Sequence, residues 1–151
     1  MTDARLEQEA LLEAWMAMTA WIRGNRLLET FSMNEMLILS ALVRRQELGG
    51  PMLTATELCQ TTRLLKSQIN HILTSMEDQG LIERLRSRED RRLIHLRLRE
   101  EGLTLYHQEH AHVLEILNTV CGALGPEGTR QLTALLSIAT AAAAQCQTSN
   151  Q

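Results

Sequence analysis

Four small polar side chains recur at helical spacing and could form hydrogen bonds to a ligand. At about 100° per residue, Ser67, Asn70, His71 and Thr74 fall on one side of a helix. The opposite side is apolar and consists of Leu65, Ile69, Ile72, Leu73 and Met76. We call the uncharged polar side the reading face, because its donors and acceptors suit base edges in a DNA major groove. An ordinary solvated face is the alternative, although such a face normally carries Lys and Glu pairs.

Seven arginines lie close together shortly after the reading face. Only Glu89 and Asp90 oppose them, so the net charge of residues 84–99 is +5. The seven are Arg84, Arg86, Arg88, Arg91, Arg92, Arg97 and Arg99. A short turn has little structural need of so many guanidiniums, which bind phosphates and base edges well. Lys66, near the start of the expected helix, suits a phosphate better than a base.

The charge of the chain is unevenly distributed. Its net charge of −3 by itself argues weakly against nucleic acid as a partner. However, residues 50–99 carry 9 basic and 6 acidic side chains, whereas the segments before and after them are net acidic. A basic patch on an acidic body orients a protein on DNA. Double-stranded DNA is therefore the expected partner.

The segments around the reading face predict a winged helix-turn-helix. A capping box at Thr54–Glu57 opens a short helix, and Gly80 suits the left-handed position after the reading helix. The stretches 81–87 and 93–99 read as two strands of a hairpin, the wing, with a polar tip at residues 87–91. The candidate DNA contacts are Lys66, Ser67, Gln68, Asn70, His71, Thr74, Arg84, Arg86, Arg88, Arg91 and Arg92.

This winged-helix region is expected to span residues 32–99. A second capping box, at Ser32–Glu35, opens a buried helix to about Glu47 that ends at the following Gly-Gly-Pro. Met52 and Leu53 are expected to add a short strand. Leu65 or its neighbour stands where a capping hydroxyl is usual, which leaves the start of the reading helix open by a residue or two.

Helical segments flank the winged-helix region. Residues 1–30 and 100–146 are expected to be helical, with apolar stripes that need a partner. The first helix is expected to run to about Leu28, and Gly125-Pro126 to interrupt the helical segment after the wing. The tail from Gln147 is expected to fray.

These elements predict one domain over residues 1–151, mainly α with a small β-hairpin wing. The flanking helices are expected to pack against each other and against a second copy of the chain, which makes a homodimer. Two-fold symmetry would then place two reading helices about 34 Å apart, one turn of DNA.

The order of these elements, together with four short motifs, resembles the MarR family of bacterial transcription regulators. Lys66-Ser67 opens the reading helix, and Gly80-Leu81-Ile82 closes it. Asp90-Arg91-Arg92 lies at the wing, and Glu101-Gly102 begins the next helix. The separations between these motifs match the family pattern, and the likeness covers nearly the whole chain.

The resemblance implies a homodimer that binds a palindromic operator, usually as a repressor released by a small molecule. Arg91 or Arg92 would enter the minor groove, while Asp90 holds the wing arginines in place. Two departures affect local geometry. Leu65 stands where the family often has Ser, and Arg99 where it often has a capping Thr, so Arg99 could add a phosphate contact.

The resemblance also implies a site for an effector, often a phenolic or other aromatic acid, beside the dimer helices. Candidate lining residues are Trp15, Met18, Trp21, Arg23 and Met36. The alternative is that this Trp and Met stripe forms the core of a dimer interface.

Histidines and cysteines give no convincing metal or redox site. His107 and His110 share a helix face, whereas His112 points away, so the first two are interpreted as the edge of an interhelical seam. Cys59 and Cys121 are expected to be small buried residues, and the third cysteine, Cys146, forms no Cys-x-x-Cys pair. A metal- or redox-responsive regulator of the same fold stays open as an alternative.

No catalytic motif, metal site or cofactor is expected, because the sequence carries no phosphate-cradling glycine loop, metal-ligand cluster or nucleophile motif. A signal peptide and a membrane-spanning apolar run are also absent from the sequence, which makes the cytoplasm the expected location and a membrane an unexpected partner. The remaining alternative is a winged helix that binds an acidic protein rather than DNA.

Overall fold

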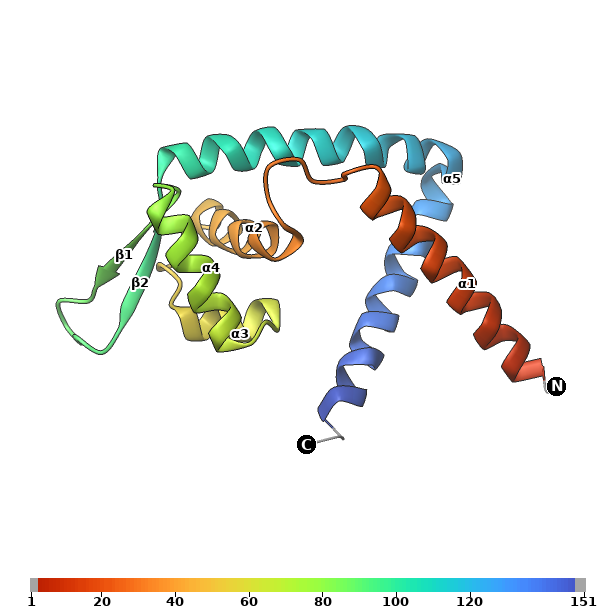
Figure 1. The fold of residues 1–151 in the computed structure, drawn as a ribbon, viewed down its shortest axis with the longest axis horizontal. Helices are drawn as coiled ribbons and strands as arrows, with labels where there is room; N and C mark the ends of the chain where they lie inside the picture. Colours follow the sequence, from red (N-terminus) through yellow and green to blue (C-terminus); the bar gives the residue numbers. More distant parts are fainter. Residues whose placement is uncertain (1–2, 149–151) are drawn as a thin grey trace. The chain divides into compact units, whose positions relative to one another are not determined.

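The computed structural model describes residues 3–148, which form five helices and one β-hairpin (Figure 1). The order is α1 Asp3–Gly24, α2 Met33–Glu47, α3 Ala55–Thr62, α4 Lys66–Asp78, β1 Ile82–Arg86, β2 Ile94–Leu98 and α5 Glu100–Thr148. The mainly helical class with a small hairpin is confirmed. The chain divides into two compact units, residues 1–112 and 113–151. The assignment of one domain to residues 1–151 stays a prediction.

The core of the first unit joins α2, α3, α4 and the base of the hairpin. The fully buried large side chains are Ile38, Leu39, Leu58, Ile69, Leu73, Met76 and Ile82. They come from four elements, and burial of their apolar side chains against one another holds these elements together. Phe31 before α2 and Tyr106 on α5 also belong to this core cluster.

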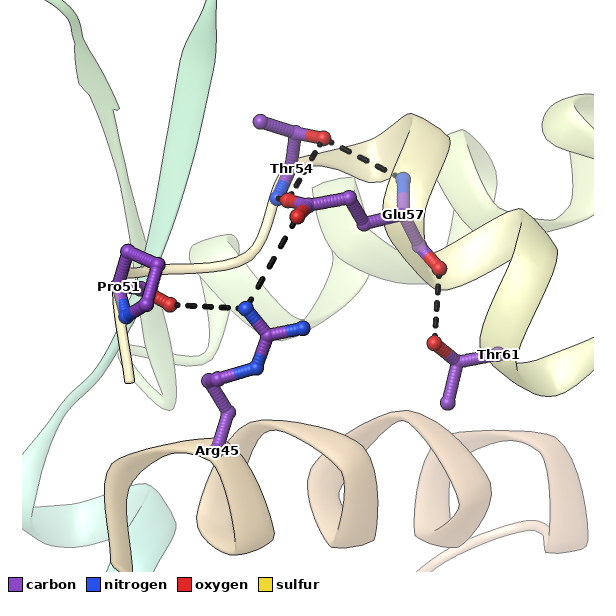
Figure 2. A network of polar contacts seen from close by, with 5 residues as sticks. All are labelled: Arg45, Pro51, Thr54, Glu57 and Thr61. Atoms are coloured by element: carbon purple, nitrogen blue, oxygen red, sulfur yellow. Dashed lines mark hydrogen bonds and ion pairs between the residues drawn. The ribbon is translucent and has the colours of Figure 1, made fainter. Parts of the chain in front are cut away.

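Both expected capping boxes are present. The Ser32 hydroxyl accepts a hydrogen bond from the Glu35 backbone N–H at 3.2 Å, and the Glu35 carboxylate accepts one from the Ser32 N–H at 2.7 Å. Thr54 and Glu57 make the same reciprocal pair at the start of α3. Arg45 of α2 lies 3.9 Å from the Glu57 carboxylate, which links the end of α2 to the start of α3 (Figure 2).

The hairpin is antiparallel, and Ile82 pairs with Leu98 while Arg86 pairs with Ile94. Leu96 is buried, but Ile94 near the tip is 40% exposed, so the apolar face of β2 is covered only toward the base of the hairpin. The expected strand at residues 52–53 is reduced to a bridge, in which the Leu96 N–H donates to the Leu53 carbonyl at 2.8 Å.

The connection between α1 and α2 is held by a buried carboxylate. α1 ends at Gly24, four residues earlier than expected, and Arg26 follows with a positive φ of 45°. Glu109 on α5 is only 4% exposed. Its two oxygens accept hydrogen bonds from the backbone N–H groups of Glu29 and Thr30, the latter at 2.8 Å. The Glu109 carboxylate therefore fixes this connection against α5.

The second unit is the part of α5 from Val113 onward. Gly125 has φ 69° and ψ 173°, a conformation open essentially to glycine, so the expected interruption at Gly125-Pro126 is confirmed. The helix then runs to Thr148, and the expected frayed tail lies, from residue 149 on, outside the described residues. None of the helices over residues 3–148 is long and apolar enough to cross a membrane.

Candidate nucleic-acid interface

The reading face is exposed because α4 is anchored by its other side. Ile69, Leu73 and Met76 have no exposed surface, while Ser67, Asn70, His71 and Thr74 are all exposed. The expectation for Leu65 is wrong, since its side chain is 67% exposed. Leu65 precedes the first helical residue and has extended backbone angles. The rotation of about 100° per residue that placed Leu65 on the apolar side therefore does not hold for it.

The first turn of α4 lacks a side-chain acceptor from its N-cap. Leu65 cannot accept a hydrogen bond, although the Gln68 side-chain oxygen accepts one from the Leu65 N–H at 3.0 Å. This bond leaves the amide NH₂ of Gln68 as its free polar end. Uncapped N–H groups and the Lys66 ammonium at a helix N-terminus favour an anion such as a phosphate.

The turn at the wing tip is built by its own polar residues. The Ser87 hydroxyl accepts hydrogen bonds from the backbone N–H groups of Glu89 and Asp90, each at 3.3 Å. The Asp90 carboxylate accepts one from the backbone N–H of Arg92 at 2.9 Å. Asp90 therefore shapes the backbone at the tip through a backbone donor rather than through a guanidinium.

The arginines of the wing fall into two groups. Three are paired with acids: Arg97 with Glu83 at 2.6 Å, Arg99 with Glu83 at 3.8 Å, and Arg84 with Glu77 at 3.1 Å. The other four, which we call the tip arginines, are exposed, and within residues 3–148 their guanidiniums make no hydrogen bond or ion pair. The tip arginines are Arg86, Arg88, Arg91 and Arg92.

Arg84 connects the wing to the reading face. Its guanidinium donates to the Glu77 carboxylate, to the Asn70 carbonyl at 3.2 Å and to the Thr74 hydroxyl at 3.2 Å. Its backbone N–H also donates to Glu77, at 3.2 Å. Because Arg84 lies on β1 and the other three residues lie on α4, the base of the wing borders the reading face (Figure 1).

Comparison with known proteins agrees with this geometry. A family model described as "MarR family" matches residues 30–93. The homoprotocatechuate degradative operon repressors of Escherichia coli and Shigella flexneri are each 30% identical to the chain over 87 residues. The match covers 58% of this chain and 59% of each repressor, so it spans less than two thirds of these relatives.

Solved structures share the fold over most of the chain. The PcaV transcriptional regulator from Streptomyces coelicolor, in complex with its natural ligand, has a TM-score of 0.72 at 20% identity, with 87% of this chain and 91% of that chain covered. NadR in complex with 4-hydroxyphenylacetate has a TM-score of 0.63 at 26% identity, and the match covers 85% of this chain and 87% of NadR. The likeness to the MarR family is thus carried by residues 30–93, while the solved structures share the fold over most of the chain.

The motifs that carry the MarR resemblance have structural partners here. Gly102 packs so closely on the Leu81 carbonyl that an added Cβ would collide with it, which explains a glycine at the start of α5. Arg99, one of the two departures, pairs with Glu83, and its backbone N–H donates to the Leu81 carbonyl at 2.9 Å. The charge of Arg99 is thus partly neutralised.

One basic residue that the sequence did not single out also lies beside α4. Arg63 follows α3 with a left-handed φ of 60°, its side chain is exposed, and no described residue pairs with its guanidinium. A glycine is the usual residue for this conformation after a helix. The arginine between α3 and α4, where a glycine is expected, is the sequence signal that could have identified Arg63 as a candidate contact.

The five candidate effector residues differ in burial. Trp15, Met18 and Trp21 are 61%, 51% and 41% exposed on α1, and Arg23 is exposed as well. Met36, by contrast, belongs to the core. The dimer-core interpretation and the effector interpretation of these residues both stay predictions.

Three hollows in the first unit are lined by other residues. One, of about 370 Å³, lies between the end of α2, residues 49–53 and β2. A second, of about 330 Å³, is lined by α2 residues including Arg44 and by Tyr106, His107 and His110. A third, of about 150 Å³, borders Arg45, which the contacts in Figure 2 hold against Pro51 and Glu57.

The histidines and cysteines form no metal cluster within the part of the chain that the structure describes. The His110 ring stacks on Tyr106 with the ring centres 5.4 Å apart, which agrees with a seam position. Cys59 is half-buried against the core, but the expectation that Cys121 is buried is wrong, because this part of α5 leaves it exposed. The side chain of Cys146 lies outside the described residues.

Proposed function

We propose that the protein is a homodimeric, sequence-specific DNA-binding regulator that acts as a repressor on a palindromic operator. One observation carries the proposal: Arg84 ties β1 to Asn70 and Thr74. An uncharged polar helix face therefore borders a hairpin with four arginines whose guanidiniums pair with no described residue. A neutral hydrogen-bonding surface suits the major groove, and unpaired guanidiniums suit the adjacent phosphates and minor groove.

The proposed contacts divide by chemistry. Ser67, Asn70, His71 and the amide NH₂ of Gln68 would meet base edges. The uncapped start of α4, with Lys66, would hold a phosphate. The tip arginines would contact phosphates or enter the minor groove. Arg63 would add a phosphate contact, and Asp90 would keep the tip in shape.

Selection of bound duplexes from a random pool tests this proposal directly. A palindromic consensus is expected, and its affinity should fall at least about 10³-fold between 50 and 200 mM salt if six or more phosphates are neutralised. Binding without salt dependence would contradict the proposed contacts. If no duplex is retained even at low salt, the protein-binding alternative for the wing is favoured.

The proposed repressor role and its release by a small aromatic acid rest on the relatives. Two are named repressors of a homoprotocatechuate degradative operon, and NadR was solved with 4-hydroxyphenylacetate. Addition of 4-hydroxyphenylacetate or homoprotocatechuate to the bound operator is expected to release the protein. Unchanged binding at millimolar concentrations of both would exclude this effector class.

A further inference from the structure

The hydroxyl of Thr74 is already used within the protein. It donates to the Asn70 carbonyl at 2.9 Å and accepts from the Arg84 guanidinium at 3.2 Å. A hydroxyl has one hydrogen to donate, so Thr74 has no donor left for a base. The guanidinium beside its oxygen further restricts access to the remaining lone pair. Of this exposed side chain, the γ-methyl group is the part without a polar partner.

Arg84 is itself held firmly in this position. The Glu77 carboxylate accepts both from its guanidinium and from its backbone N–H, and the Arg84 side chain is only 25% exposed. A partly buried, multiply bonded guanidinium is restricted in its movement. The Thr74 hydroxyl therefore stays occupied while the protein approaches DNA.

We infer that Thr74 is a specificity-determining residue that recognises the methyl group of a thymine, and that Arg84 enforces this by occupying the Thr74 hydroxyl. The inference rests on the proposed function, because it requires α4 to lie in the major groove. Only thymine presents a methyl group there, and apolar contact with a Thr methyl is an established way to recognise it. Thr74 would thus favour thymine at one position of each half-site without forming a hydrogen bond to it.

Replacement of single thymines by deoxyuridine in the selected operator tests this, because it removes only the methyl group. At one position of each half-site, replacing thymine by deoxyuridine should lower the affinity of the wild-type protein about fourfold. This is the effect expected from the loss of one buried methyl group. Thr74→Ser, which keeps the hydroxyl, should bind thymine and deoxyuridine equally at that position. Thr74→Val, which keeps a methyl group and loses the hydroxyl, should still discriminate between them.

The same substitutions at Thr133 are the matched control. Thr133 is an exposed helical threonine whose hydroxyl also donates to a carbonyl four residues earlier, at 2.9 Å, and it lies on the second unit. Thr133→Ser and Thr133→Val should leave the thymine preference unchanged, and circular dichroism checks that all variants are folded.

The reverse result would overturn the inference. If Thr74→Val loses affinity for every sequence while Thr74→Ser behaves as wild type, the hydroxyl rather than the methyl group makes the contact. Discrimination that persists in Thr74→Ser would also reject it. Failure of the wild-type protein to bind any duplex is a different outcome, because that result rejects the proposed function itself.

Discussion

At the scale of the residue, the proposed DNA binding should depend on those exposed arginines whose charge no acid neutralises. The guanidiniums of Arg91 and Arg92 have no partner among the described residues, whereas the Arg97 guanidinium lies 2.6 Å from the Glu83 carboxylate. Arg91→Ala or Arg92→Ala should weaken operator binding on the order of tenfold. Each substitution should also lower the number of counterions released on binding, measured as the slope of log affinity against log salt concentration, by about one. Arg97→Ala is the control and should change both quantities much less, as titrations at several salt concentrations would measure. Equal losses in all three variants would contradict this distinction.

The buried Glu109 carboxylate gives a prediction about stability. Its two oxygens accept from the Glu29 and Thr30 N–H groups, and a glutamine would offer one acceptor and place an NH₂ against a donor. Glu109→Gln should therefore lower the free energy of unfolding by about 1–3 kcal/mol in urea titrations. Glu115→Gln, at an exposed position of α5, is the control and should have little effect. An unchanged midpoint for Glu109→Gln would show that the connection is held by other contacts.

Sequence reasoning predicted residue positions well where the cause is local. The reading face follows from the helical period alone, and its four residues are exposed as expected. The neutralisation of Arg97 depends on the register that sets Glu83 opposite it across the hairpin, and this could not be read from composition. The role of Glu109 depends on partners about 80 residues away, so no local pattern pointed to it.

At the scale of the element, the start of α4 is weaker than the starts of its neighbours. Leu65 has the extended backbone of an N-cap but no acceptor, whereas Ser32 and Thr54 cap α2 and α3. Leu65→Ser should raise the free energy of unfolding by about 1 kcal/mol. Urea titrations would measure this change. Leu65→Ala is the control, because it removes the exposed leucine without adding a cap, and it should not stabilise the protein.

The junction between wing and α4 distinguishes a positioning role of Arg84 from a direct phosphate contact. If Arg84 positions the wing through Glu77, then Arg84→Met and Glu77→Gln should both weaken operator binding, and the double mutant should be no weaker than either alone. If Arg84 instead binds phosphate, removal of the Glu77 charge should leave binding unchanged or tighten it. Titrations of the wild type, the two single variants and the double variant against one operator measure the coupling energy between Arg84 and Glu77.

Prediction at the scale of elements succeeded where signals are close in sequence. Both capping boxes and the break at Gly125-Pro126 are present because each depends on a few adjacent residues. The sequence predicts the end of α1 too late, because the helical pattern continues past Gly24 while the connection that Glu109 holds consists of turns and bends. In place of the strand expected at residues 52–53 there is a single bridge between Thr54 and His95, with one hydrogen bond from the Leu96 N–H to the Leu53 carbonyl.

At the scale of the whole molecule, each unit leaves large apolar side chains uncovered. α1 has no buried residue, and Leu11 and Trp15 are 66% and 61% exposed on it. In the second unit, Leu135 and Leu136 are 63% and 56% exposed. Apolar surface on this scale is costly in water and marks an interface, which supports the proposed homodimer.

A charge placed on that surface should therefore separate the dimer. Leu136→Glu is expected to give a monomer in light scattering coupled to size exclusion, and to lose cooperative binding to the palindrome, because two reading helices are no longer joined. Ala134→Glu is the control, since Ala134 lies about 200° around the helix from Leu136 and should leave the dimer intact. A wild-type chain that is monomeric at all concentrations would contradict the proposed assembly, as would a Leu136→Glu variant that remains a dimer with unchanged operator affinity.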